Sequence, residues 1–250
     1  MSGPGKVVVI TGGTGGIGYQ AALAIAKGNA ANTVIITGRS AGSGNEAMGK
    51  IKAESGNTNV YLALGDLALQ SGVRSLAAEL LLRFPKIDVL VNNAGNLCTG
   101  TLETTADGVT KNFAVNVIAP LLLSRLLMPA LKAASPVGNV QIASGGTPFP
   151  VLSLDDIEGA KVPAGIPSYS HSKRAMEAMS LALEKELAPH GIAVNVAGGG
   201  NPGATSMTAA INIGDLPWFA RCFFPCWSCI TAPDNGESAG FSSPLLLEVM

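Results

Sequence analysis

Short runs of β-branched and aliphatic residues alternate along the chain with longer stretches of helical periodicity. The apolar runs lie at 6–11, 33–37, 59–64, 87–92, 139–144 and 192–197. This alternation predicts strands that are joined by crossover helices, and therefore a parallel sheet. Because the runs are almost continuously apolar, both faces of the sheet should be covered. We predict an α/β fold in which helices pack on both faces of a doubly wound parallel sheet.

The same pattern places two long helices and two irregular segments. We expect the helices around 105–134 and 168–190. The segment 145–167, which has four prolines, and the segment 198–208, which begins GGGNPG, indicate loops. No linker or internal repeat divides the chain, and its length suits one α/β unit. We therefore expect a single domain over 1–250.

Composition and charge narrow the classes of partner. Hydrophobic residues make up 47% of the sequence and the mean hydropathy is +0.36, so the chain can bury a large core. Sixteen basic and seventeen acidic residues give a net charge of −1. That balance provides no broad electrostatic surface for nucleic acid, and we expect none to bind. Any phosphate site must be local.

The apolar segments do not indicate secretion or a membrane span. The N-terminus enters a β-branched run directly, without the pattern of a signal peptide, and we expect a cytoplasmic protein. The richest apolar run, 113–131, contains Asn116, Ser124 and Arg125. These polar residues favour a buried amphipathic helix over a bilayer span, so no membrane contact is expected.

The four cysteines do not form an obvious site. Their number and spacing are unsuited to a disulfide scaffold in a chain of this length. Cys222, Cys226 and Cys229 lie within CFFPCWSC, where zinc could bind, but a fourth ligand is not evident nearby. Their apolar neighbours indicate that they pack as small hydrophobic side chains. We predict no metal.

A glycine-rich loop, TGGTGGIG at 11–18, follows the first apolar run and leads into a helical pattern. Glycines at 12, 16 and 18 would let the backbone approach a pyrophosphate, and the following helix N-terminus would supply unpaired N–H groups. The loop lacks the GK[ST] ending that a triphosphate P-loop needs. The sequence therefore predicts a dinucleotide site.

The residues after the second run indicate which dinucleotide binds. That run ends TGRS, which places Arg39 and Ser40 where an enzyme that prefers NAD usually has an acidic residue. A guanidinium would attract the 2′-phosphate of NADP(H) instead, so NADP(H) is the expected cofactor. The alternative is that Arg39 is a solvated loop residue.

Tyr169 and Lys173 form the candidate catalytic pair, within YSHSK at 169–173. Residues four apart on a helix have Cβ atoms about 5–6 Å apart, so an ammonium can lie beside a phenol. A neighbouring positive charge lowers the pKa of tyrosine from about 10 and gives an acid/base group without histidine. His171 lies about 200° around the helix and should face away. The alternative is an aromatic residue on the core beside a surface lysine.

Together, these motifs resemble those of the short-chain dehydrogenase/reductase family over residues 5–205. The matching features occur in family order: TGGTGGIG, Asp66 after the third run, NNAG at 92–95, Asn116 in FAVN, Ser144 after the fifth run, YSHSK, and Pro202-Gly203. The resemblance implies a Rossmann-type fold. The long interval between Ser144 and Tyr169 is similar to that of the retinol dehydrogenase and protochlorophyllide reductase-like branch.

The resemblance also implies roles for individual residues. Asn116, Ser144, Tyr169 and Lys173 match the family's catalytic tetrad. Tyr169 would give a proton to the substrate oxygen, Ser144 would hydrogen-bond that oxygen, and Asn116 would help to hold a water. The implied cofactor-binding residues are Thr11, Gly12, Thr14, Gly16, Ile17, Gly18, Arg39, Ser40, Asp66, Leu67, Asn93, Ala94, Gly95, Tyr169, Lys173, Pro202, Gly203 and Thr205.

Three of these matches have simpler interpretations that stay open. Asp66, which the resemblance places at the adenine, could be a turn residue at the end of a strand. NNAG, which it places at the adenosine side of the cofactor, could be an ordinary turn. Asn116 could be a polar helix residue that bonds to backbone.

The segment 215–230, DLPWFARCFFPCWSCI, falls where the family places a substrate lid, and we expect a lid around 205–230. Its aromatic residues suit an apolar substrate, although the segment could also pack as an ordinary helix or touch a membrane surface. We expect an NADPH-dependent oxidoreductase of apolar ketones, aldehydes or alcohols. The alternative is a protein that senses or scaffolds with NADP(H) and has no chemistry. The two long helices resemble those through which family members form a homodimer or homotetramer.

Overall fold

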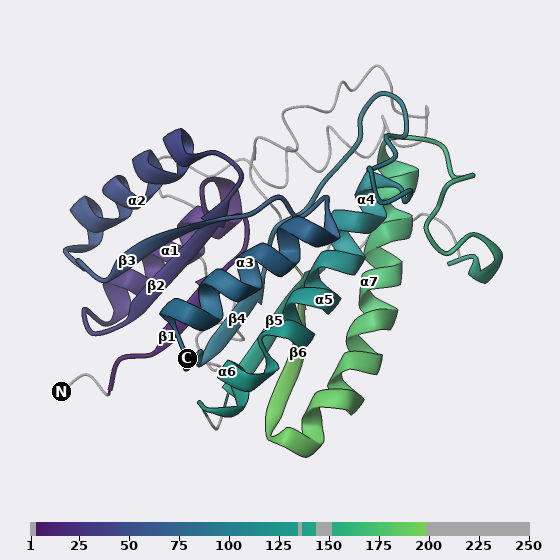
Figure 1. Ribbon diagram of the computed structural model, residues 1–250. Helices are drawn as coiled ribbons and strands as arrows, with labels where there is room; N and C mark the ends of the chain where they lie inside the picture. The colour runs from purple at the N-terminus through teal and green to yellow at the C-terminus, as the bar shows by residue number, and fades with distance from the viewer. Residues whose placement is uncertain (1–3, 135–136, 144–151, 199–250) are drawn as a thin grey trace, which may run out of the picture.

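Six parallel strands form the single sheet of the computed structural model, which describes residues 4–134, 137–143 and 152–198 (Figure 1). The sheet order is β3-β2-β1-β4-β5-β6, and every ladder is parallel. The strands are β1 Val7–Ile10, β2 Thr33–Gly38, β3 Val60–Leu64, β4 Val89–Asn92, β5 Val137–Ala143 and β6 Ile192–Gly198. A strand thus lies at each of the six apolar runs, and the doubly wound fold is confirmed.

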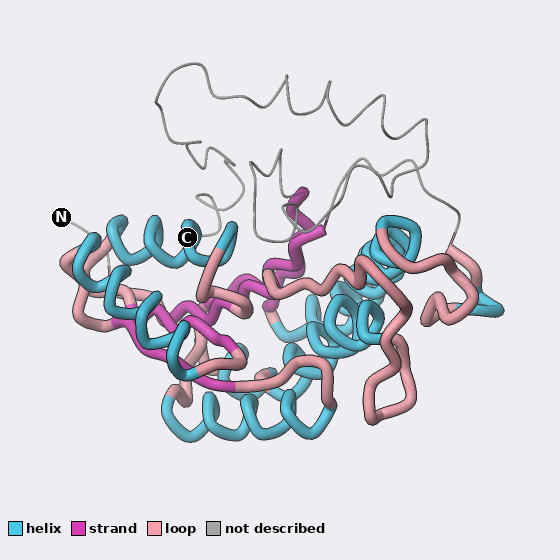
Figure 2. Tube along the Cα trace, turned by 90° about the horizontal axis from the view of Figure 1, so that it is seen from above, coloured by secondary structure: helices cyan, strands magenta, loops and turns pink. Residues whose placement is uncertain are grey.

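Helices lie on both sides of the strands, as Figure 2 shows from above. They are α1 Gly16–Gly28, α2 Ala41–Ser55, α3 Gln70–Arg83, α4 Lys111–Phe113, α5 Ala119–Leu126, α6 Met128–Lys132 and α7 Ile166–Leu187. A π-helical turn, η1 Ala114–Ile118, joins α4 to α5, and two 3₁₀ turns are η2 Leu154–Asp156 and η3 Ala188–His190. None of the helices within the described residues has both the length and the apolar character that crossing a membrane requires.

The central strand β1 shows why the apolar runs have no polar alternation. Val8 and Ile10 pack in the cluster that includes α1 and α2, whereas Val9 packs in the opposite cluster with α3, α5 and α7. All three side chains are completely buried. Burying a side chain of this size contributes about 1.5–3 kcal/mol, so both faces of the strand favour the fold.

The strand order reverses between β1 and β4, and this switch point positions the candidate site. Ligands of doubly wound sheets bind in the crevice beyond the carboxyl ends of the strands at such a point. Two hydrogen bonds join the loops that follow these strands. Asn93 Nδ2 donates to the Thr11 carbonyl at 2.9 Å, and the Ala94 N–H donates to Thr11 Oγ1 at 3.0 Å. The glycine loop and the NNAG segment therefore lie side by side, where a doubly wound fold is expected to have its ligand crevice.

The prediction of one helix over about 105–134 is wrong in two respects: the helix starts later, and it is interrupted. Residues 104–110 form a turn that is closed by an antiparallel bridge between Thr104 and Thr110, and helix begins only at Lys111. The turn includes Gly108 at φ 82°, a conformation that a helix cannot contain. Between α5 and α6 the helix breaks again near Pro129, which has no N–H to donate to the preceding turn.

Candidate active site

The glycine loop holds its shape through two residues with positive φ and one close approach. Gly12 and Gly16 have φ values of 66° and 55°, which side chains disfavour. A Cβ on Gly18 would lie 2.3 Å from Asn93 Nδ2 and 2.5 Å from the Gly12 carbonyl oxygen. Gly15 precedes α1 without a side-chain cap, so the first N–H groups of the helix are not capped by that residue. These features fit a pyrophosphate.

Two further glycines support the loop, and the sequence analysis did not identify them. A Cβ on Gly13 would lie 2.7 Å from Ile36 Cγ2, and a Cβ on Gly38 would lie 2.6 Å from Thr14 Cγ2. Both contacts join the glycine loop to β2. The sequence did contain a signal for Gly13, because TGG has a second glycine directly after Gly12. A contact with pyrophosphate would not by itself require that second glycine.

Arg39 and Ser40 follow β2 directly at the carboxyl edge of the sheet. Both residues are exposed, and Arg39 forms no ion pair with the residues that the structure describes. The Ser40 carbonyl accepts the Gly44 N–H at 3.0 Å, so it begins α2 through its backbone. The arginine is therefore accessible to a ligand in the crevice, and its contact with a 2′-phosphate stays a prediction.

Asp66 lies in a turn at the end of β3, as its simpler interpretation expects. Its Oδ1 accepts the Ala68 N–H at 3.0 Å, and its backbone carbonyl accepts the Leu69 N–H at 3.4 Å. Leu67 is half-buried and packs against the core. The exposed carboxyl group still lies at the carboxyl edge of the sheet, where the implied adenine contact stays a prediction.

Asn116 is fully buried in η1, and its side chain bonds to two segments. Its Oδ1 accepts the Asn96 N–H at 2.7 Å. Its Nδ2 donates to the Asn96 carbonyl at 3.0 Å and to Ser172 Oγ at 2.8 Å. The amide thus links the loop after β4 to α7 by hydrogen bonds. The water that the family resemblance assigns to Asn116 stays a prediction.

Tyr169 and Lys173 lie together on α7. The Lys173 Nζ is 5.6 Å from the centroid of the Tyr169 ring, a distance at which a cation is attracted to an aromatic face. Tyr169 is half-buried and Lys173 is only 5% exposed. Burial lowers the pKa of Lys173 to about 8, and nearby Glu177 opposes this shift. The helix therefore holds an ammonium beside the phenol at neutral pH.

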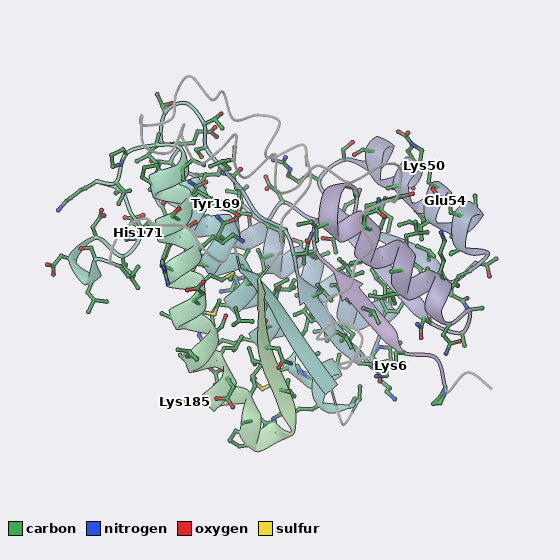
Figure 3. All side chains as sticks on the ribbon, turned by 180° about the vertical axis from the view of Figure 1, so that it is seen from behind. Lys6, Lys50, Glu54, Tyr169, His171 and Lys185 are labelled. Carbon is green, nitrogen blue, oxygen red and sulfur yellow. The ribbon has the colours of Figure 1, made fainter. Side chains whose placement is uncertain are left out.

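His171 lies on another side of α7 from Tyr169, as Figure 3 shows. It is 1% exposed, and neither ring nitrogen has a hydrogen-bond partner within the described residues. A Cβ on Gly159, whose φ is 69°, would lie 2.9 Å from His171 Nδ1, so the segment before α7 covers the ring. Burial lowers the pKa of His171, partly offset by Asp156.

Several predicted residues lie outside the described residues: Ser144, Pro202, Gly203, Thr205, the lid around 205–230 and the three cysteines of CFFPCWSC. Their roles stay predictions. Within the part of the chain that the structure describes, no group of three His, Cys, Asp or Glu side chains could hold a metal. Cys98, which is described, is a buried free thiol.

A group of polar residues that was not predicted joins α7, which carries Tyr169 and Lys173, to α4, to η1 and to the loop after β4. Asn96, Asn112, Ser168 and Ser172 are polar, and the last three are buried. Hydrogen bonds join them to one another and to Asn116. Their four-residue spacing, Asn112 with Asn116 and Ser168 with Ser172, was the only signal in the sequence. This spacing predicts no contact until the two helices are known to pack against each other.

The amino-acid sequence of the chain is similar to those of known dehydrogenases. Residues 6–215 match a family model described as short chain dehydrogenase. Retinol dehydrogenase 12 of Mus musculus is 33% identical over 189 residues, which are 76% of this chain and 59% of that protein. Polyprenol dehydrogenase of Mus musculus is 28% identical over 239 residues, which are 93% of this chain and 69% of that protein. The chain thus matches only part of the length of these relatives.

A solved structure has the same arrangement of elements. A metagenomic short-chain oxidoreductase in complex with NADP superimposes with a TM-score of 0.64 at 26% sequence identity. The match covers 79% of this chain and 83% of that protein. The likeness extends to most of both chains and supports the doubly wound assignment.

We predict that Lys173→Met raises the free energy of unfolding at pH 7 by about 1–3 kcal/mol, because it removes a buried charge. The folded pKa of about 8 lies below the reference value of 10.5. The cost of the charge is therefore fully present below pH 8, and it disappears as the pH rises toward 10.5. Urea unfolding at pH 7 and pH 9.5 measures the difference. Exposed Lys185, on the same helix, gives the control Lys185→Met; a destabilised Lys173→Met protein would contradict the prediction.

We predict that His171→Leu reduces the loss of stability on acidification. The folded pKa of His171 lies below the reference value of 6.5, so the unfolded chain binds the proton more readily. Wild-type stability should therefore decrease as the pH falls through 6.5 toward the folded value. Thermal unfolding at pH 7.5 and about pH 5.5 checks this, with exposed His190→Leu as control. Equal pH dependence in wild type and His171→Leu would refute the prediction.

Proposed function

The chain belongs to the short-chain dehydrogenase family, and we propose that it is an NADPH-dependent oxidoreductase that interconverts an apolar ketone or aldehyde with its alcohol. The observation that carries the proposal is the Tyr169–Lys173 pair on α7, with the cation 5.6 Å from the ring centroid. Both residues match family motifs for catalysis. Retinol and polyprenol dehydrogenases are among the chain's relatives.

The proposed chemistry is a proton transfer at the substrate oxygen. NADPH, when bound, would supply the hydride to the carbonyl carbon. Tyr169 then donates its phenolic proton to the oxygen as negative charge develops there. The Lys173 ammonium stabilises the phenolate that remains. Ser144 is proposed to donate a second hydrogen bond to the same oxygen. In alcohol oxidation, the phenolate accepts the proton instead.

Cofactor choice rests on the charge at the end of β2. Arg39 is exposed and has no ion-pair partner within the described residues, so a 2′-phosphate would not compete with an internal carboxylate. A guanidinium binds phosphate in bidentate geometry, whereas NADH offers it only ribose hydroxyls. The NADP in the metagenomic oxidoreductase structure supports the same choice.

The proposed substrate class rests on the apolar alcohols that two relatives are named for and on the aromatic residues of segment 215–230. The names of two relatives specify retinol and polyprenol, which are largely apolar alcohols. The segment 215–230 contains Trp218, Phe219, Phe223, Phe224 and Trp227, which would contact an apolar ligand. We propose a lid of this kind over the crevice.

We predict that Tyr169→Phe lowers kcat by about 10³-fold. In the proposed mechanism the phenol is the only group that gives a proton to the substrate oxygen. The affinity for NADPH should change less than about twofold, since the ring and the helix are retained. NADPH absorbance with a panel of apolar ketones and aldehydes measures turnover. Unchanged turnover in the variant would contradict the role of Tyr169. If the wild type binds NADPH and reduces no carbonyl of the panel, a sensing or scaffolding function is favoured.

We predict that Arg39→Ala weakens NADPH binding by about 10–100-fold, which corresponds to one charge-assisted contact. The affinity for NADH should stay within about twofold, because the removed guanidinium would contact only the 2′-phosphate. Fluorescence titration of the two reduced cofactors provides both values. Tighter binding of NADH than of NADPH by the wild-type protein would refute the proposed preference.

A further inference from the structure

Two buried amide–hydroxyl hydrogen bonds join the η1 region to α7. Asn112 Nδ2 donates to Ser168 Oγ at 2.7 Å, and Asn116 Nδ2 donates to Ser172 Oγ at 2.8 Å. We call these two pairs the upper rung and the lower rung. All four side chains are 4% exposed or less. Each rung lies four residues, about one helical turn, from the other on both helices.

Asn96 connects the two rungs to the loop after β4. Its backbone bonds to the Asn116 amide, and its Nδ2 donates to Asn112 Oδ1 at 2.8 Å. Asn112 Oδ1 also accepts the Cys98 N–H at 3.2 Å. The Asn112 amide therefore bonds to three residues in two segments. A buried amide with this many partners fixes the relative position of those segments.

The upper rung also fixes the first turn of α7. Ser168 Oγ donates to the Gly165 carbonyl at 3.2 Å, and the Gly165 N–H donates to the Cys98 carbonyl at 2.8 Å. The start of α7 is thus bonded to α4 through Ser168 and to the loop after β4 through Gly165. Tyr169 follows Ser168 directly, so the rotation that the upper rung imposes also sets the direction of the phenol.

Each rung serine precedes a member of the candidate catalytic pair. Ser168 precedes Tyr169, and Ser172 precedes Lys173. Successive helical residues point about 100° apart, so the contact that each serine makes also sets the direction of the residue that follows it. The lower rung includes Asn116, to which the family resemblance already gives a role. The upper rung has no assigned role.

We propose that Asn112 and Ser168 are positioning residues that hold the first turn of α7 in the rotation that keeps Tyr169 at the crevice. The inference rests on the proposed oxidoreductase function. Without the upper rung, the first turn of α7 can rotate while the lower rung still holds the second turn. Displacement of a reacting group by about 1 Å costs up to about 100-fold in rate, so even a small rotation would lower turnover.

Ser168→Ala and a matched control test the proposal. Ser180 lies on the same helix, is 1% exposed and donates to its own helix at Met176 O, 2.8 Å away. Both Ser→Ala changes remove one buried hydroxyl. We expect Ser168→Ala to lower kcat about tenfold with the KM for carbonyl and the Kd for NADPH within about twofold, and Ser180→Ala to leave kcat unchanged. Ser168→Thr, which retains the hydroxyl, should restore kcat to within about threefold of wild type.

A coupling measurement identifies the partner of Ser168. Asn112→Ala should also lower kcat, and the double variant Asn112→Ala with Ser168→Ala should lose little more than the larger single effect. Additive losses would show that the two residues act separately and would overturn the upper rung as a unit. If Ser168→Ala fails to fold, Ser168→Cys replaces it, since the thiol is similar in size and is a weak hydrogen-bonding group.

A second measurement does not need turnover. The chain has three tyrosines, so the absorbance change near 295 nm on titration, minus that of Tyr169→Phe, reports the Tyr169 phenol. Ser168→Ala should shift its midpoint, because the ring changes its position relative to Lys173 and its degree of burial, and Ser180→Ala should not. This outcome holds even if no carbonyl is reduced, so failure of the proposed function is distinguishable. Equal kcat and equal midpoints for Ser168→Ala and Ser180→Ala would overturn the proposal.

Discussion

The parallel ladder between β1 and β4 is the constraint on which the candidate site depends. It pairs Val8 with Val89 and Ile10 with Val91, so the two strands end side by side. Since the chain order reverses here, no crossover helix fills the space beyond these ends. The glycine loop and the NNAG loop both emerge into that space. Packing of β1 on its two faces favours this register, because a slip by one residue would move each completely buried side chain into the opposite core cluster.

The helices that carry the candidate catalytic residues also bury several polar side chains. Asn112, Asn116, Ser168, Ser172 and Lys173 are all at least nine-tenths buried. An amide buried without partners would cost about 1–3 kcal/mol, and these amides have partners. Burial of Lys173 has a separate effect, because it lowers the pKa of the ammonium to about 8. The protein thus retains a cation at the expense of stability, in the place where the proposed chemistry requires one.

Strands were predictable because their signal is local and strong. Each of the six parallel strands lies at an apolar run, and the observed ends differ from the runs by two residues or fewer. The start of the helix expected at 105 was not predictable in this way, because the bridge between Thr104 and Thr110 depends on contacts that periodicity does not contain. Tyr169 and Lys173 could be identified because four residues of one helix bring them together. The pair Asn112 and Ser168, 56 positions apart, requires the packing of two helices.

The π-helical turn η1 has a consequence for chain length. It contains five residues, Ala114–Ile118, and its i to i+5 bond runs from the Ala119 N–H to the Ala114 carbonyl. Such a turn accommodates one residue more than a regular α-helix of the same rise. Deleting a single residue there would restore a regular helix without rotating the turns before it, whereas a deletion within α5 would rotate them by about 100° around the axis. A single-residue deletion within these five positions should therefore disturb the packing of the preceding turns less than a deletion within α5.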